Sequence, residues 1–175
     1  MIKVHLYLIL LLLLFPHSIT ATSISVVNID NIINTNNKYI KTIEKIESSQ
    51  KKFHSKFKEQ ENLLDKQLTE IDNSKLLLDE NEIQLMINQY NKDFNDFDIM
   101  INDFNLHYQN QIINIRNIIL DEIIMIIEKY ANDNNIELIL DSSNYLIASN
   151  AINITSEIKN ELNKIELILE FDDFK

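Results

Sequence analysis

The side chains that could carry out acid–base or metal chemistry are few in this sequence. Beyond residue 21 it contains only two histidines, His54 and His107, which are far apart along the chain. Neither has a second histidine four residues away, the spacing that places two ligands on one face of a helix. Both are better interpreted as solvated residues on helix faces. Cysteine and glycine are absent, which excludes thiolate nucleophiles, disulfides and the glycine-dependent loops that hold phosphates.

Acidic residues are numerous, but their spacing does not converge on a site. The acids between Asp79 and Glu82 lack the alternation and the glycine of a calcium-binding loop. Four later aspartates would point around a helix in different directions, as on a solvated face: Asp93, Asp96, Asp98 and Asp103. The sequon Asn153–Thr155 fits the start of a helix better than a glycosylation site. We therefore expect no enzyme activity, no cofactor and no metal site.

The longest feature is the stretch from Ile83 to Tyr130, which contains neither glycine nor proline. Its first half has the apolar a/d seam of a helix that packs along a partner helix. The seam comprises Ile83, Ile87, Tyr90, Phe94, Phe97, Ile101, Phe104 and Tyr108. Beyond Ile112 the pattern is apolar on nearly every side, as in a buried helix. We expect a rod of roughly 70 Å that projects from a compact body.

A second long helix begins at Lys38 and has a weaker seam. That seam includes three glutamines: Ile43, Ile46, Gln50, Phe53, Phe57, Gln60, Leu64, Gln67 and Ile71. The connection between the helices, Asp72 to Glu82, is short, so the two helices must run antiparallel. The first helix is net basic and the second net acidic, which favours the same pairing, although each exposed charge pair contributes little.

Shorter elements are expected on either side of this hairpin. Residues 24–29 are β-branched and predict a strand, and Asp30 is a candidate N-cap for a short helix. After the Asn-rich residues 132–135, residues 136–140 alternate as a strand, and Tyr145–Ala148 can return as its hairpin partner. Thr155 is a candidate N-cap for a last helix, and the tail from Phe171 to Lys175 is expected to fray.

The chain begins with the pattern of a secretory signal over residues 1–21. Lys3 supplies a positive charge, Leu6–Phe15 an apolar run, and Ser18–Ala21 a cleavage region. The apolar run is too short for a comfortable membrane span, which needs roughly 20 residues. The remainder, 22–175, is enough for a single domain. The formal net charge of −11 argues against nucleic acid as a partner.

Two apolar surfaces exceed what the hairpin itself needs. Between Ile118 and Ile127 more sides are apolar than one hairpin and a small sheet can cover, so this region should support oligomerisation. The predicted oligomerisation core comprises Ile118, Ile119, Ile123, Ile126, Ile127, Val26, Leu138 and Leu140. The second surface is an outer stripe at heptad position f of the later helix, interrupted by Lys92: Leu85, Ile99, Leu106 and Ile113. Met86 and Met100 widen this stripe, whereas the equivalent line of the first helix is polar.

The order of these elements resembles the Skp/OmpH family of periplasmic chaperones. Two stretches are similar to the family: the opening strand 24–29 with Asp30, and residues 136–155, in which a strand, Asp141, a turn and a second apolar run precede Asn153-Ile154-Thr155. The resemblance implies a homotrimer with a body, here 22–37 and 112–170, and a helical arm, here 38–111. It also implies ATP-independent holding of unfolded outer-membrane proteins in the periplasm.

On this interpretation the outer stripe contacts clients, and the tip leucines Leu76, Leu77 and Leu78 are further candidates. Well-studied members are basic, but the tip here is acidic, with a single Lys75 among Asp72, Asp79, Glu80 and Glu82. This departure argues against binding of anionic lipid. The alternative function is that of an envelope coiled-coil adaptor, a spacer that holds no client. The stripe distinguishes the two, because a spacer does not need apolar residues facing away from its partner helix, although a contact between arms or subunits could also use them.

Overall fold

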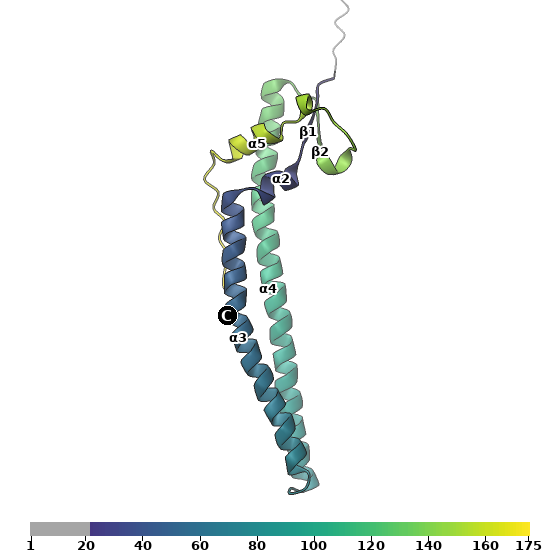
Figure 1. The fold of residues 1–175 in the computed structure, drawn as a ribbon, viewed down its shortest axis with the longest axis vertical. Helices are drawn as coiled ribbons and strands as arrows, with labels where there is room; N and C mark the ends of the chain where they lie inside the picture. Colours follow the sequence, from purple (N-terminus) through teal and green to yellow (C-terminus); the bar gives the residue numbers. More distant parts are fainter. Residues whose placement is uncertain (1–21) are drawn as a thin grey trace, which may run out of the picture.

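The computed structural model describes residues 22–175 and shows two long antiparallel helices with small elements gathered at one end (Figure 1). We call this end the root and the opposite end the tip. In chain order the elements are β1 (Ile24–Val27), α2 (Ile29–Asn34), α3 (Asn37–Ser74), α4 (Glu80–Asn134), β2 (Leu138–Asp141), two 3-10 turns (Ser142–Asn144 and Asn150–Ile152) and α5 (Thr155–Leu162). The predicted α+β class and the helical hairpin are confirmed. The predicted signal at 1–21 lies outside the described residues.

Asparagine and aspartate side chains set the ends of the long helices. The Asn36 side chain accepts hydrogen bonds from the backbone N–H groups of Lys38 and Tyr39, both at 3.0 Å. Asp79 and Glu82 form a reciprocal capping box that starts α4. α4 ends at Asn134, and the next residue, Asn135, adopts the left-handed conformation with φ 53°, a role that asparagine fills when glycine is absent. At 55 residues, α4 is about 80 Å long.

The strands form a parallel pair, with Ile24 opposite Leu138 and Val27 opposite Asp141. Strands 136–140 and 145–148 were expected to form an antiparallel hairpin, and this prediction is wrong. Residues 145–148 form no strand; after β2 the chain makes two 3-10 turns, and the Ile154 N–H then donates to the Val26 carbonyl at 2.9 Å. The first strand therefore takes its partners from two remote parts of the chain.

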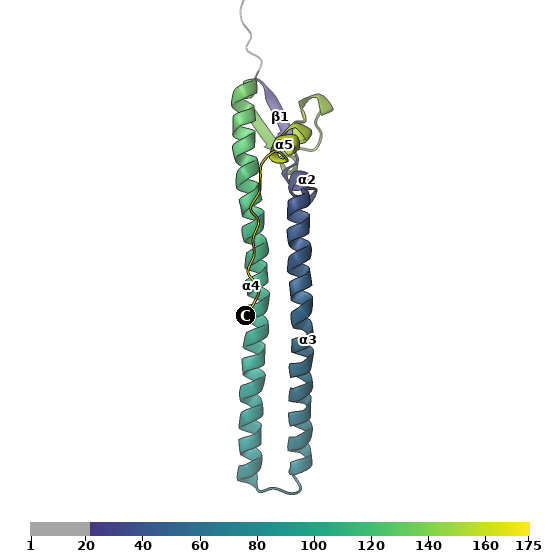
Figure 2. The same ribbon diagram turned by 90° about the vertical axis from the view of Figure 1, so that its left-hand side faces the viewer.

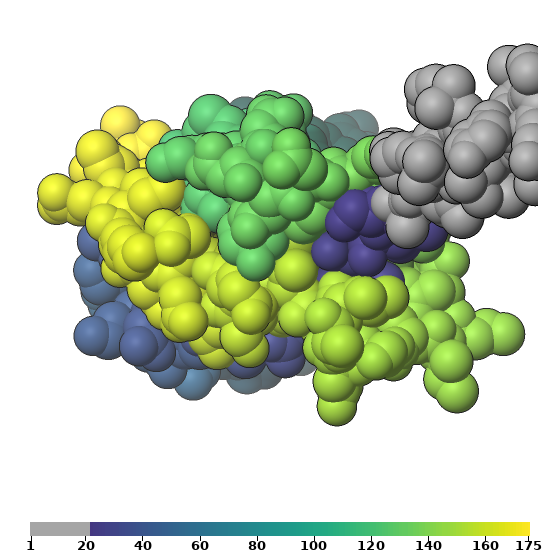
Figure 3. Space-filling view, turned by 90° about the horizontal axis from the view of Figure 1, so that it is seen from above, coloured from purple at the N-terminus to yellow at the C-terminus, as the bar shows by residue number. Residues whose placement is uncertain are grey.

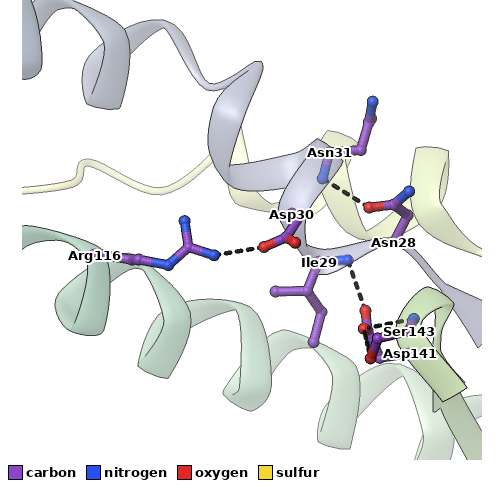
Figure 4. A network of polar contacts seen from close by, with 7 residues as sticks. All are labelled: Asn28, Ile29, Asp30, Asn31, Arg116, Asp141 and Ser143. Carbon is purple, nitrogen blue, oxygen red and sulfur yellow. Dashed lines mark hydrogen bonds and ion pairs between the residues drawn. The ribbon is translucent and has the colours of Figure 1, made fainter. Parts of the chain in front are cut away.

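The short helix α2 is tied to the end of β2 by polar contacts (Figure 4). Asn28, not the predicted Asp30, caps α2 by accepting from the Asn31 N–H at 2.8 Å. Asp30 instead forms an ion pair with Arg116 of α4. One carboxylate oxygen of Asp141 accepts from the Ile29 N–H at 3.1 Å, and the other accepts from the Ser143 backbone and hydroxyl.

Thr155 is also not the helix cap that the sequence suggested. α5 begins at Thr155, the cap position is held by Ile154 without a capping bond, and the Asn153 side chain accepts from the Thr155 N–H at 2.9 Å. The Thr155 hydroxyl instead accepts from the Asn28 N–H at 2.9 Å. Thr155 thus joins the start of α5 to the start of α2, an inter-element role that local capping rules do not anticipate.

The core lies at the root, where α2 and α5 pack against α4. The fully buried residues there include Ile32, Ile33, Ile115, Ile119, Ile123 and Ile158. Viewed from the root end, α5 and the residues after it lie between α4 and α3 (Figure 3). The chain then runs down the hairpin as far as its middle (Figure 2). The prediction of a frayed tail is wrong, because Phe174 packs against aromatic rings of both long helices.

The Asp141 contacts generate a prediction about stability. Burial raises the pKa of Asp141, but the hydrogen bonds from Ser143, Ile29 and Ser142 outweigh it, so the pKa lies below its usual value near 3.8. The charged form therefore stabilises the fold above the unfolded-state pKa, and this contribution is lost as the pH falls through the folded-state pKa. We expect Asp141→Ala to lower the free energy of unfolding at pH 7 by about 1–3 kcal/mol.

Urea unfolding of parent and variant at pH 7 and at pH 3 tests this prediction. The difference between the two proteins should be smaller at pH 3 than at pH 7, because the stability that the charged Asp141 contributes declines once the pH falls below the unfolded-state pKa. The control is Asp121→Ala on the exposed side of α4, which should change stability by no more than about 0.5 kcal/mol. Equal stability of parent and Asp141→Ala at pH 7 would contradict the assigned role.

Candidate binding surfaces of the hairpin

The contact between α3 and α4 is aromatic at mid-length. Phe57 of α3 meets Phe104 of α4 edge-on, with ring centroids 4.9 Å apart. Phe104 in turn lies 5.0 Å from Tyr108, also edge-on. Phe53 and Phe97 extend the same group. Such pairs contribute about 0.5–1.5 kcal/mol beyond the burial of their area, so this aromatic cluster fixes how the helices are aligned, as the two seams predicted.

Nearer the tip the contact is polar. Gln67 of α3 donates to Asp93 of α4 at 2.7 Å, while the other side-chain atom of Gln67, Oε1, is buried without a hydrogen-bond partner among the described residues. A buried polar atom without a partner costs free energy. The Gln67–Asp93 contact therefore holds α3 and α4 together less firmly than the aromatic cluster does. With Asp93 turned inward, the predicted seam residue Phe94 is exposed and stacks on Tyr90 instead.

The outer stripe is exposed where the heptad positions placed it. Leu85, Ile99 and Leu106 retain 69%, 49% and 56% of their accessible surface. Met100 is also exposed, and Met86 is half-buried. From Leu85 to Leu106, α4 therefore exposes apolar side chains on the side that faces away from α3.

The tip consists of a tight connection from Lys75 to Asp79, shorter than the predicted 72–82. The side chains of Leu76, Leu77 and Leu78 are all exposed. Lys75 pairs with Asp72 at 2.7 Å between exposed side chains, so its charge is partly offset within the tip. Three exposed leucines beside acidic groups suit an apolar partner better than an anionic one.

The predicted oligomerisation residues divide into two groups. Ile119, Ile123, Ile126 and Val26 are buried within the chain itself, and Ile127 and Leu140 are half-buried. Ile118 and Leu138 are exposed. Further exposed apolar residues at the root, which the sequence did not single out, are Ile24, Ile124, Met125, Leu146 and Ile147. The sequence pattern did not separate the residues that form the chain's own core from those that stay exposed, and their role in oligomerisation stays a prediction.

In residues 22–175, few side chains are placed so that they could bind a metal or carry out acid–base chemistry. Within residues 22–175, no group of three or more His, Cys, Asp or Glu side chains could hold a metal ion. His54 is exposed, but His107, expected to be solvated, is half-buried and hydrogen-bonds through Nε2 to the Asp172 carbonyl at 2.8 Å. In the same part of the chain, no helix is long and apolar enough to cross a membrane.

Comparison with known proteins places these features in a family. A family model described as outer membrane protein (OmpH-like) matches residues 23–162. The fold is similar to the crystal structure of a proposed outer membrane chaperone (OmpH-like) from Caulobacter crescentus CB15, with a TM-score of 0.74. That alignment covers 89% of this chain and 92% of the other at 11% identity, so it establishes a shared fold. The comparison with curated proteins gave no match.

Proposed function

We propose that this chain, which belongs to the OmpH-like family of outer membrane proteins, is a holding chaperone. Its clients would be unfolded outer-membrane proteins, which it would keep from aggregating in the periplasm without ATP. The secretory pattern at residues 1–21 supports the location. The proposal needs neither a cofactor nor a catalytic residue, since holding requires only reversible contacts.

The observation that carries this proposal is the outer stripe on α4. Exposed apolar side chains lower solubility, and a passive spacer has no use for them on the side that faces away from its partner helix. Leu85, Ile99 and Leu106 can each bury part of a client side chain. Contacts of this kind are weak singly, but several arms acting on one unfolded chain multiply their effect through effective concentration. Weak, repeated contacts also let the client leave without an energy source.

Electrostatics would modify client choice. The net charge of −11 gives the assembled protein a negative field, which repels acidic clients and attracts basic segments. The exposed leucines of the acidic tip, Leu76 to Leu78, are further candidate client contacts. The acidic side chains around them argue against anionic lipid as a second partner.

The assembly that brings several arms together is proposed to be a homotrimer formed through the root. Ile118 and Leu138 are exposed in the body, and Leu146 and Ile147 are exposed in the loop after β2, which projects from the root (Figure 3). Tyr145 is in an extended conformation, so this loop can lie along another copy. Burial of such residues against a second and third chain would contribute roughly 25 cal/mol for each Å² removed from water. The body would then be 22–37 with 112–170, and the arm 38–111.

Replacing the three stripe residues with asparagine tests the client contacts. We expect Leu85→Asn, Ile99→Asn and Leu106→Asn together to leave fold and assembly unchanged, because exposed substitutions cost only about 0.5 kcal/mol each. Binding of an unfolded β-barrel protein should weaken by about 1 kcal/mol for each apolar side chain replaced. Fluorescence titration and a light-scattering aggregation assay measure this, and Ile99 and Leu106 should account for most of the effect.

Two controls make this result specific. Asn88→Ser, Asn102→Ser and Gln109→Ser alter exposed polar neighbours on α4 and should leave client binding intact. Phe97→Asn, in the aromatic cluster, should instead lower the stability of the hairpin. If the triple stripe variant suppresses aggregation as well as the parent, the stripe is not a client surface. If it no longer assembles, the stripe is a subunit contact.

Neighbouring isoleucines of α4 test the assembly. Ile118 is 42% exposed and Ile119 is fully buried. We expect Ile118→Asp to dissociate the trimer into folded monomers, whereas Ile119→Asp should unfold the chain, since an unpaired buried charge costs several kcal/mol. Sedimentation and circular dichroism together separate the two outcomes. A parent protein that sediments as a folded monomer would refute the trimer.

A further inference from the structure

The C-terminal residues beyond α5 form an extended tail that lies along both long helices (Figures 1 and 2). From Leu167 to Phe171 its side chains alternate between the hairpin and solvent, and this alternation ends at Asp172 and Asp173, which are both exposed. Leu169 retains 6% of its accessible surface and its neighbour Ile168 retains 70%. Leu167 is buried and Phe171 is half-buried on the same side as Leu169, whereas Glu170 is exposed. This is the period of two that an extended strand shows when one face is covered.

The end of the tail is held in the aromatic cluster. The Phe174 ring lies 5.6 Å from Phe53 of α3 and 5.5 Å from Phe104 of α4, centroid to centroid. The Phe174 N–H donates to the Tyr108 hydroxyl at 3.4 Å. The tail therefore bridges the two helices instead of lying on one of them.

Polar contacts on either side of Phe174 reinforce this position. The Ser49 hydroxyl of α3 donates to the Asp173 carboxylate, and His107 of α4 hydrogen-bonds to the Asp172 carbonyl. The tail carries four acids at 166–175 and runs beside the stretch of α3 from Lys38 to Phe53, which contains five lysines and two glutamates. The local charges are thus complementary, although the chain as a whole is acidic.

We propose that the groove between α3 and α4 at the root half of the hairpin is a client site, and that the tail occupies it as an internal competitor. The occupant it fits is an extended segment with apolar residues at alternate positions and an aromatic residue near its end. Transmembrane strands of β-barrels have this design, with about ten residues, alternating polarity and flanking aromatic girdles. The inference rests on the proposed function, and it assigns a specific segment of the client to a specific groove.

The tail makes client binding conditional. Because it is tethered to α5, its effective concentration at the groove is high. A client strand therefore encounters the groove only in the fraction of molecules whose tail has left, and its apparent affinity is reduced by that fraction. A single weakly binding strand would not displace the tail, whereas an unfolded barrel protein, which offers many such strands, would displace it.

A disulfide that reversibly holds the tail in the groove, which we call the lock, tests the proposal. The chain contains no cysteine, so Ser49→Cys with Asp173→Cys provides one defined disulfide at residues whose side chains already touch. We expect the oxidised protein to bind an unfolded β-barrel protein about fivefold more weakly than the reduced protein, because the competent fraction falls. The parent, titrated with and without reductant, should not change.

The converse variant releases the tail. Leu169→Ser should increase client affinity, while the matched control Ile168→Ser, on the solvent side of the same tail, should leave it unchanged. Equal affinity of the oxidised and reduced lock would overturn the inference while leaving the holding function intact. Absence of client binding by the parent and by both forms of the lock would overturn the proposed function and the groove assignment together.

Discussion

The parallel pairing of β1 with β2 is the constraint on which the rest of the molecule depends. Parallel strands cannot be joined by a tight turn, so the chain must leave the root and return to it before the pair can close. Here the excursion is the entire helical hairpin, and the hydrogen bond from Ile29 to Asp141 joins residues 112 positions apart. Closing so long a loop costs entropy, which the buried isoleucines of α4 and α5 must offset. The hairpin can therefore project from the root, and the packing between α3 and α4 can vary in stability along its length.

That difference in firmness suits a holding function. The aromatic cluster aligns α3 with α4 at mid-length, the Gln67–Asp93 level near the tip is polar, and the outer side of α4 carries exposed apolar residues. In the proposed trimer, a firm root would set the spacing of the arms while their outer parts could adjust to clients of different size. The tail would add selectivity, because it favours clients that present many alternating segments over those that present one.

Features with a local periodic cause were predictable from the sequence, and features with a remote partner were not. The two long helices and the exposure of Ile99 and Leu106 follow from heptad positions, and the antiparallel arrangement follows from the short connection between the helices. The parallel strand pair was missed because Tyr145–Ala148 offered a nearer apolar run, and adjacency in sequence carries no information about which strand pairs with β1. Phe94 was misplaced because the Gln67–Asp93 contact turns Asp93 inward at that level. The tail was overlooked because its apolar residues are separated by acids and lie at the chain end, where fraying is the usual expectation.

Crosslinking along α4 tests the central claim, that the hairpin holds clients through its apolar surfaces. A photoreactive amino acid would be placed singly at Leu106 on the outer stripe, at Lys92 in its gap, and at Asn62 on the polar back of α3, and each protein irradiated with an unfolded β-barrel protein. The proposed holding function predicts strong adducts from Leu106, weaker adducts from Lys92 and few from Asn62, with no adducts once the barrel protein has folded. Adducts of equal yield at the three positions, or none at Leu106, would contradict it.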